Sequence, residues 1–509
     1  MNPEREARGE KLAANVVVIG GGGAGLVAAV AAAEKGARVT VLEARRVPGG
    51  NAVNAIGLFA VIGDKGTDIN AQRDDYFKKT MGYAHWRINA RVVRALINKS
   101  GDLVPWLEAK GLKPERTDFF GPVHASVVLR CGTIPEGIGY EVAKAMVKTC
   151  EELGVRFLYR TRAKKLIVGR EGRVTGVMAV AKGKELIVDA GSVIIATGGF
   201  VGNQRLLKKF LPPYHDDDDI FLGGLPHKGD GLLMATEIGA ATEIIAAPEM
   251  SVNRFPWSSC LFIIIKHPGT IWVNKNGERF TDESVHEAAN SQYRQPGKTS
   301  YTLIDEKIKE AIFQSDLSPI DDTILKANMT LDVIEEKIRQ SIRKEGLFVG
   351  SSPWQTIAEK DLHFQADRGR VKISSSWEEI AQWMGADPVA LKGTIDKYNA
   401  ACSQGHDDIF AKDRKYLLPL RTPPYYAIRC YLNLMVTHGG IKINHNMEVL
   451  DKRDSPIPGL YAAGVEAASA DLETYNPGLP AHGYGFAVNS GRIAGESAAE
   501  FASGKQDKY

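Results

Sequence analysis

The chain has 509 residues, of which 44% are hydrophobic and 25% are charged, and its net charge is +3. These values are ordinary for a globular protein with two or three domains. The small net charge creates no strong field, so we expect neither nucleic acid nor a membrane surface as a partner. Five scattered cysteines contain no CxxC pair and give no indication of haem, iron–sulfur or zinc. We therefore predict no metal site.

The N-terminal segment MNPEREARGEKLAAN is polar and lacks the apolar core of a signal peptide. This predicts a cytoplasmic protein. The longest apolar stretch, VVVIGGGGAGLVAAVAAA, is interrupted by glycines, whereas a membrane helix needs about 20 continuous apolar residues. We expect it to form a buried strand, a turn and a helix, and we expect no membrane span.

A nucleotide-binding pattern begins in this stretch. The β-branched run VVVI has the form of a buried parallel strand, GGGGAG supplies GxGxxG, and a small-residue helix precedes a second strand that ends at Glu43. Gly20 would make the tight turn, Gly22 would let the backbone approach a pyrophosphate, and Gly25 would let the helix pack on the strand. Glu43 would accept hydrogen bonds from ribose hydroxyls. The combined spacing predicts a Rossmann-like dinucleotide site.

Several motifs beyond Glu43 carry a family resemblance. PGGN follows it within a few residues, and LIVDAGSVIIATGGFVGN, WVNKNGERFTDES, HKGDGLLMATEIGA and IPGLYAAG occur far downstream. Together they resemble the FAD-dependent fumarate reductase and succinate dehydrogenase flavoprotein family over nearly the whole chain. The resemblance implies an α/β fold with a discontinuous FAD-binding domain, residues 1–245 and 421–509, and an inserted α+β capping domain, residues 246–420.

The resemblance also implies which further residues contact FAD. They are Gly49, Gly50, Asn51, Gly57, Ala163, Ala196, Thr197, Gly198, Asp230, Gly464, Glu466, Ala481, Gly483 and Tyr484. Asn51 stands where succinate dehydrogenases carry the histidine that binds FAD covalently, so we expect non-covalent FAD. Glu466 follows YAAG one residue later than the family's glutamate does. His482 and the GYG after it are assigned to the flavin, because N–H groups at the start of the last helix would face the N1 and C2 carbonyl edge of the ring.

Two candidate proton donors lie in the capping segment. In this family the flavin exchanges a hydride with a substrate carbon while a protein group handles the proton on the adjacent carbon. Arg279 aligns with the arginine that is the active-site acid of fumarate reductases; a structural role is the alternative. His286 stands where ketosteroid dehydrogenases place a tyrosine facing the substrate, and an imidazole there would relay a proton near neutral pH. A surface histidine is the alternative.

The chain departs from the fumarate reductase pattern at two places. In LMVTHGG, Met435 and Val436 replace the family's histidine pair and His438 appears before the two glycines. No arginine occurs between Ala462 and Gly491, where the family presents one. A dianion would lose paired charge-assisted hydrogen bonds here. Fumarate and succinate are therefore not the expected substrates.

The loop YNPGLPAHGYGF offers a different kind of contact. Tyr475 and Gly478 resemble the tyrosine and glycine with which ketosteroid dehydrogenases hold a ketone oxygen. A phenol O–H and a backbone N–H that converge on a carbonyl oxygen would stabilise enolate charge, as in an oxyanion hole. A packed loop aromatic is the alternative for Tyr475.

The leading hypothesis is an FAD-dependent oxidoreductase that acts on a CH–CH bond next to a carbonyl, either as a ketone desaturase or as an enone reductase. Its candidate catalytic residues are Tyr475, His286, Arg279, His438 and Gly478. No fused haem, FMN-attachment or NAD(P)H domain is recognisable, so we expect a separate electron carrier. Two alternatives are a reductase of another unsaturated acid with Arg279 as acid, and a redox-neutral hydratase or isomerase that contains FAD.

Overall fold

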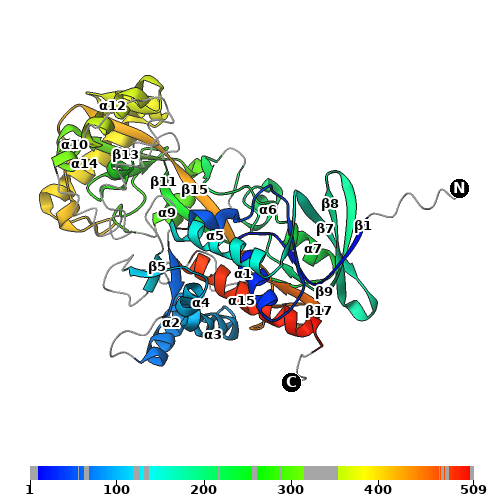
Figure 1. Ribbon diagram of the computed structural model, residues 1–509. Coiled ribbons are helices and arrows are strands. Elements are labelled where there is room, and N and C mark those ends of the chain that lie inside the picture. Colours follow the sequence, from blue (N-terminus) through cyan, green and yellow to red (C-terminus); the bar gives the residue numbers. More distant parts are fainter. Residues whose placement is uncertain are drawn as a thin grey trace. The chain divides into compact units, whose positions relative to one another are not determined.

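The structure, a computed structural model, describes residues 10–55, 57–61, 68–117, 127–130, 137–211, 214–215, 218–254, 261–285, 288–314, 354–468, 471, 475 and 481–504. The chain forms two compact units, whose helices and strands are labelled in Figure 1. The first contains residues 1–212, 224–249 and 436–509, and the second contains residues 213–223 and 250–435. The second unit ends later than the expected 420, because the long strand β15 (Tyr425–Ile441) begins in the second unit and ends in the first.

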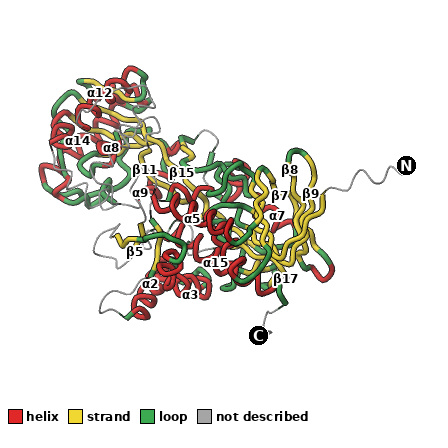
Figure 2. Tube along the Cα trace, in the orientation of Figure 1, coloured by secondary structure: helices red, strands yellow, loops and turns green. Residues whose placement is uncertain are grey.

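An eight-stranded sheet forms the centre of the first unit. Its order is β16-β17-β9-β1-β2-β6, with β8 paired to β9 and β7 paired to β8. Strands β7, β8, β9 and β17 of this sheet are labelled in Figure 2. The strands are β1 (Glu10–Ile19), β2 (Val39–Glu43), β6 (Arg156–Tyr159), β7 (Thr161–Val168), β8 (Val174–Ala181), β9 (Lys184–Ile195), β16 (Glu448–Leu450) and β17 (Pro456–Ala462). β1 is parallel to both β2 and β9, and β17 is parallel to β9. Parallel neighbours bring the ends of these strands to one edge, as in a Rossmann-like fold.

Two helices from opposite ends of the chain pack together beside this sheet. They are α1 (Gly23–Glu34) and α15 (His482–Ala502), which lie side by side in Figure 1. Glycines allow the close approach: a Cβ at Gly491 would lie 2.5 Å from the carbonyl oxygen of Ala24, and one at Gly495 would lie 2.3 Å from that of Ala28. The C-terminal segment is thereby held against the first helix of the dinucleotide pattern.

The first unit also contains further helices and a second, three-stranded sheet. The helices are α2 (Ile69–Tyr83), α3 (Ala90–Lys99), α4 (Leu103–Glu108), α5 (Gly137–Glu152), α6 (Gln204–Phe210) and α7 (Asp230–Glu237), with 3-10 turns at η2 (Gly50–Asn54), η3 (Ser100–Asp102) and η4 (Arg170–Gly172). A three-stranded sheet has the order β3 (Leu58–Ala60), β5 (Val127–Arg130) and β4 (Glu115–Thr117).

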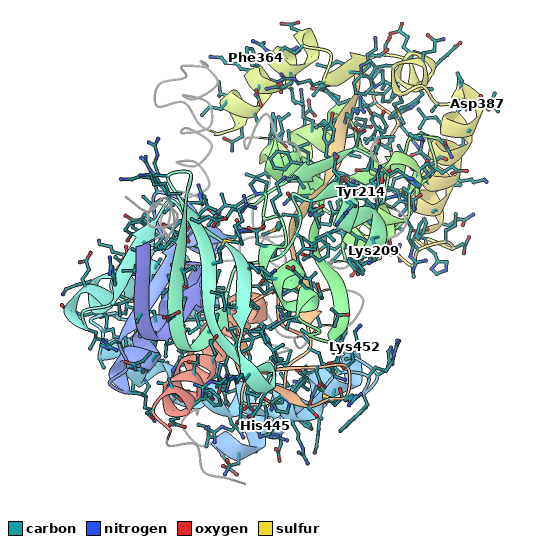
Figure 3. All side chains as sticks on the ribbon, turned by 90° about the vertical axis from the view of Figure 1, so that its right-hand side faces the viewer. Lys209, Tyr214, Phe364, Asp387, His445 and Lys452 are labelled. Carbon is teal, nitrogen blue, oxygen red and sulfur yellow. The ribbon has the colours of Figure 1, made fainter. Side chains whose placement is uncertain are left out.

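The second unit is a mixed sheet with helices. The order is β10-β15-β13-β12, and β11 and β14 also pair with β15. The strands that lie within the second unit are β10 (Ile220–Leu222), β12 (Ile271–Asn274), β13 (Ser300–Asp305) and β14 (Val371–Ser374), whereas β11 (Thr242–Arg254) begins in the first unit and ends in the second. The helices of the second unit are α8 (Phe262–Lys266), α9 (Ala288–Tyr293), α10 (Glu306–Gln314), α12 (Trp354–Asp367), α13 (Trp377–Met384) and α14 (Pro388–Gln404), with η5 (Pro296–Lys298) and η7 (Arg414–Tyr416). Asp387, labelled in Figure 3, caps α14 by accepting a hydrogen bond from the Val389 N–H at 3.0 Å. The predicted α/β fold class is confirmed.

None of the described helices is long and apolar enough to cross a membrane. Within the described residues there is also no group of three His, Cys, Asp or Glu side chains that could hold a metal ion.

Candidate active site

The glycines of GxGxxG connect β1 to α1 and are required there for two different reasons. Gly20 has φ +99°, and a Cβ there would lie 2.3 Å from the carbonyl oxygen of Ala196; a Cβ on Gly25 would lie 1.9 Å from that of Gly20. At each of these glycines a backbone carbonyl oxygen lies where a Cβ would have to go, so no side chain fits. At Gly22, by contrast, an added Cβ would approach described atoms no more closely than the Cα of Gly50, at 4.0 Å. Space is therefore left beside Gly22 for a ligand.

The N-terminus of α1 opens onto this space. Gly22 is the N-cap, makes no side-chain cap, and is followed by no acidic residue in the first turn. The first N–H groups of a helix have no partner within the helix and carry partial positive charge, so they suit a pyrophosphate. Glycine turn and helix end together fit the dinucleotide part of FAD.

Glu43 and the second glycine pair lie around the same turn. The Glu43 carboxylate, at the end of β2, accepts hydrogen bonds from Gly21 N–H at 2.8 Å and Arg45 N–H at 2.7 Å. Gly49 N–H donates to the Gly21 carbonyl oxygen at 2.7 Å. Asn51 Oδ1 accepts a hydrogen bond from the Leu225 N–H. These contacts hold the Glu43 carboxylate beside the glycine turn, and its contact with a ribose stays a prediction.

A second group of predicted FAD residues gathers beyond the end of β9. Glu466 accepts hydrogen bonds from the Thr197 N–H, from Thr197 Oγ1 at 2.7 Å and from Gly198 N–H at 3.2 Å. Asp230 opens α7 and pairs with Arg162 at 2.7 Å. Burial raises the pKa of Glu466 to about 8, against the opposing effect of its hydrogen bonds. The one-residue slip in the sequence has therefore not moved Glu466 away from this group.

Glu466 should make folding stability depend on pH. Its carboxyl has an ordinary pKa of 4.5, which burial raises to about 8, so between these values the unfolded chain releases a proton that the folded chain keeps. Stability from this group consequently falls as pH rises. We expect the Tm of Glu466→Gln minus the Tm of the wild type to increase as the pH is raised from about 5 to about 8. Thermal unfolding across that range measures it, with the exposed Glu185→Gln as control; a constant difference would contradict it.

The remaining predicted FAD residues also belong to the first unit. They are Gly57, Ala163, Ala196, Gly464, Ala481, Gly483 and Tyr484. Ala481 has φ +57° and is the N-cap of α15, with no side-chain cap. A Cβ on Gly23 would lie 2.9 Å from the ring of Tyr484, so the first turn of α15 reaches the first turn of α1.

Four side chains form a cluster at the start of α15, which we name the tyrosine–histidine cluster: His438, Asp471, Tyr475 and His482. The ring of Tyr475 stacks on His482 at 4.1 Å between centroids and lies 5.2 Å from the ring of His438. Its Oη accepts a hydrogen bond from Gly483 N–H at 3.3 Å. Both histidines are buried.

Asp471 lies between the two imidazoles. Its Oδ1 is 2.7 Å from His482 Nε2, and its Oδ2 is 3.4 Å from His438 Nδ1. Sequence reasoning missed Asp471, which stands alone in ASADLETY without any motif, and it assigned His482 to the flavin side. The structure brings the predicted Tyr475 and His438 together. His286 and Gly478 lie outside the described residues.

The FAD binding domain family matches residues 15–479. The chain belongs to this family. A vinyl phenol reductase of Lactiplantibacillus plantarum is 29% identical over 510 residues, with 96% of each chain covered. A urocanate reductase of Eggerthella lenta is 27% identical, covering 96% of this chain and 75% of its own length.

Two solved structures share the fold. The open conformation of a flavocytochrome c3 fumarate reductase aligns with a TM-score of 0.69 at 25% identity, covering 97% of this chain and 79% of its own. A 3-ketosteroid-delta4-(5alpha)-dehydrogenase from Rhodococcus jostii RHA1 aligns with a TM-score of 0.68 at 24% identity, covering 98% and 99%, which shows the fold alone. The predicted resemblance is confirmed. The protein is an FAD-dependent oxidoreductase.

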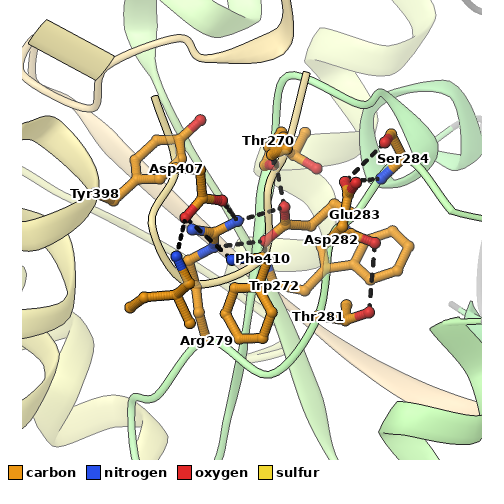
Figure 4. A network of polar contacts seen from close by, with 12 residues as sticks. Thr270, Trp272, Arg279, Thr281, Asp282, Glu283, Ser284, Tyr398, Asp407 and Phe410 are labelled. Atoms are coloured by element: carbon orange, nitrogen blue, oxygen red, sulfur yellow. Dashed lines mark hydrogen bonds and ion pairs between the residues drawn. The ribbon is translucent and has the colours of Figure 1, made fainter. Parts of the chain in front are cut away.

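Arg279 of this oxidoreductase lies in the second unit, inside a buried network of charges (Figure 4). Its Nε and Nη2 donate to the two carboxylate oxygens of Glu283 at 2.9 and 3.0 Å, and Nη2 also donates to Asp407 at 3.0 Å. The guanidinium lies near the rings of Tyr398 and Phe410, at 4.9 and 5.0 Å from their centroids. Such contacts are typical of an arginine that supports a fold.

The charges around Arg279 also oppose proton donation. Burial alone would lower the pKa of Arg279, but the carboxylates of Glu283 and Asp407 outweigh burial and raise this pKa above its usual range. Lys412 donates to the same Glu283 at 3.0 Å and to the Thr270 carbonyl oxygen at 2.7 Å. A guanidinium held by two carboxylates gives up a proton less readily than a free one.

Replacing Arg279 separates the structural role from the catalytic one. Arg279→Gln breaks the buried ion pair between Arg279 and Asp407 and leaves the carboxylate without this partner. We therefore expect a loss of about 3–5 kcal/mol in the free energy of unfolding. Urea unfolding measures this loss, with the exposed Arg294→Gln in the same unit as control. A variant with wild-type stability and greatly reduced turnover would instead support Arg279 as the acid.

Proposed function

We propose that the protein reduces a carbon–carbon double bond conjugated with a carbonyl group, and that its electrons come from a separate reduced carrier protein. The observation that carries this proposal is the tyrosine–histidine cluster at the start of α15, in which both histidines and Asp471 are buried. Tyr484, in the same helical turn as His482, contacts the dinucleotide turn at Gly23. The first turn of α15 therefore lies next to the predicted cofactor turn and also next to side chains that could donate hydrogen bonds to a substrate oxygen.

The residues around the glycine turn would hold FAD, whose chemistry when bound would be hydride transfer to the β carbon, with electrons from the carrier. Tyr475 donates its O–H to the carbonyl oxygen, since a phenol oxygen that accepts a hydrogen bond, here from Gly483, can also donate one. His438 delivers a proton to the α carbon. The π bond is lost, two C–H bonds form, and the substrate gains two electrons and two protons in total.

The charges of the cluster disfavour fumarate. Its cationic capacity lies in two imidazoles, and these already face the carboxylate of Asp471. The sequence from Ala462 to Gly491 supplies no arginine. Two substrate carboxylates would add negative charge to a buried carboxylate without paired cations, which is costly. A substrate that is neutral around its double bond fits better.

A second candidate is an alkene conjugated with a phenol. The vinyl phenol reductase, with 96% of each chain covered, favours it. The same tyrosine and histidine would then hold a phenol oxygen in place of a ketone oxygen. An unsaturated acid with Arg279 as acid is less well supported, because Arg279 is held by Glu283 and Asp407.

A substrate panel tests the proposal. Dithionite-reduced holoenzyme is mixed without oxygen with cyclohexenone, 4-vinylphenol, urocanate or fumarate, and the return of oxidised flavin absorbance is followed. We expect reoxidation by cyclohexenone, or by 4-vinylphenol for the second candidate, and a product with two more hydrogens by mass spectrometry. Reaction with fumarate alone would overturn the proposal, and product formation without any reoxidation of the flavin would indicate a redox-neutral enzyme.

Two further points belong to the proposal. Asn51 carries no imidazole for a covalent link, so acid should release all FAD from the chain. A cytoplasmic location agrees with Cys150, Cys402 and Cys430, which are free thiols in the described part of the chain.

A further inference from the structure

A single carboxylate connects the two buried imidazoles of the tyrosine–histidine cluster. The ring centroids of His438 and His482 are 6.3 Å apart, so the rings do not hydrogen-bond to each other. Each faces a different oxygen of Asp471, at 3.4 Å for His438 and 2.7 Å for His482. Asp471 is itself fully buried.

The arrangement has a consequence for protons. A buried carboxylate needs a compensating positive charge, since burying it alone is costly. An opposite charge close by favours the charged form of a titratable group, so Asp471 favours the protonated form of the His438 ring, whose Nδ1 lies 3.4 Å from Oδ2. Nε2 of His482 lies 2.7 Å from the other carboxylate oxygen, Oδ1.

We propose that Asp471 is a positioning residue which orients His438 and His482 and keeps the proton that His438 delivers to the substrate. This inference rests on the proposed function. It adds a residue that does not contact the substrate and acts through the imidazoles. No net charge is created, since the proton given to the α carbon is replaced from solvent after each turnover.

Asp471 and Tyr475 from the loop and His482 from α15 are titratable groups that lie against His438. Glu466, from the loop after β17, directs its carboxyl to Thr197 instead. Asp471 is an anionic group with described contacts to both imidazoles.

The test is the pH dependence of alkene reduction by the Asp471→Asn holoenzyme. An adjacent carboxylate favours a protonated imidazole by about 1–3 pH units, so the alkaline limb of kcat should move to lower pH by on the order of one unit or more. At pH 8 kcat should fall at least about tenfold, KM should change little, and lowering the pH should restore turnover. A merely structural residue would not give this recovery. Asp102→Asn is the control, because Asp102 pairs with Arg492 of α15 at 2.7 Å and not with the imidazoles.

A second measurement keeps the inference testable if Asp471→Asn does not fold. Nitrogen-15 spectra of histidine-labelled wild-type holoenzyme report the protonation of each ring, and loss of a signal in His438→Gln and in His482→Gln assigns them. We expect one doubly protonated imidazole at pH 7. Two neutral rings, or an unshifted pH profile in Asp471→Asn, would overturn the inference. If no alkene is reduced the proposed function fails, while the spectra still decide the role of Asp471.

Discussion

Tyr475→Phe should lower kcat by about 10²–10³-fold, because it removes the O–H that, in the proposed function, donates to the oxygen where charge develops. The ring remains, and it can still stack on His482. Gly483 N–H loses its acceptor at 3.3 Å, a small cost at the end of a helix that other contacts hold. The expected result is therefore a loss of turnover with the fold and the FAD content kept.

Steady-state kinetics with the best alkene of the panel, together with FAD content and Tm, measures this effect. Tyr159→Phe is the matched control, since Tyr159 ends β6 in the same unit and is 40% exposed. An unchanged kcat would mean that Tyr475 is only a packed aromatic. A large fall in Tm or in FAD content that accompanies the loss of turnover would also mean that Tyr475 serves the fold.

Gly22→Ala should weaken FAD binding by at least about tenfold without changing the stability of the FAD-free protein. A methyl group on Gly22 meets no described protein atom closer than 4.0 Å, and the backbone there, with φ −78° and ψ −170°, suits alanine. Only the ligand would be obstructed, because the second glycine of GxGxxG lets the backbone approach the pyrophosphate. Fluorescence titration of the apoprotein with FAD measures the affinity.

Gly25→Ala provides the contrast. Its Cβ would lie 1.9 Å from the Gly20 carbonyl oxygen, a backbone atom, so α1 must move away from β1. Overpacking of this kind costs about 1–3 kcal/mol, and the loss should appear already without FAD. Gly82→Ala, where no described atom lies within 4 Å, is the neutral control. Equal FAD affinity for Gly22→Ala and the wild type would contradict the assigned pyrophosphate position.

The strand, the glycine turn and the helix of the dinucleotide pattern could be predicted because their requirements are local. A tight turn, a close backbone approach and a helix packed on a strand each demand glycine at a set spacing, and Glu43 follows at the end of the next strand. Gly20, Gly22 and Gly25 accordingly have in the structure the surroundings that the motif predicts. The α/β fold class followed from the same strand, turn and helix.

The capping segment shows where local reasoning stops. Arg279 and Glu283 are four residues apart in a recognisable motif, but Asp407 and Lys412 join them from more than a hundred residues away. An alignment of the motif alone suggests an acid. The charges that surround Arg279 depend on tertiary packing, and they are what favours a supporting role.

The sequence by itself determined the cofactor turn, the fold class and the absence of arginine near the last loop, since each is a property of neighbouring residues. Only the tertiary structure decided that Asp471 stands between His438 and His482. A buried carboxylate becomes meaningful through the groups around it, and here these come from a strand that ends at Ile441 and a helix that begins at His482. The protonation of a buried cluster is a collective property of its members, which no single position in the chain reveals.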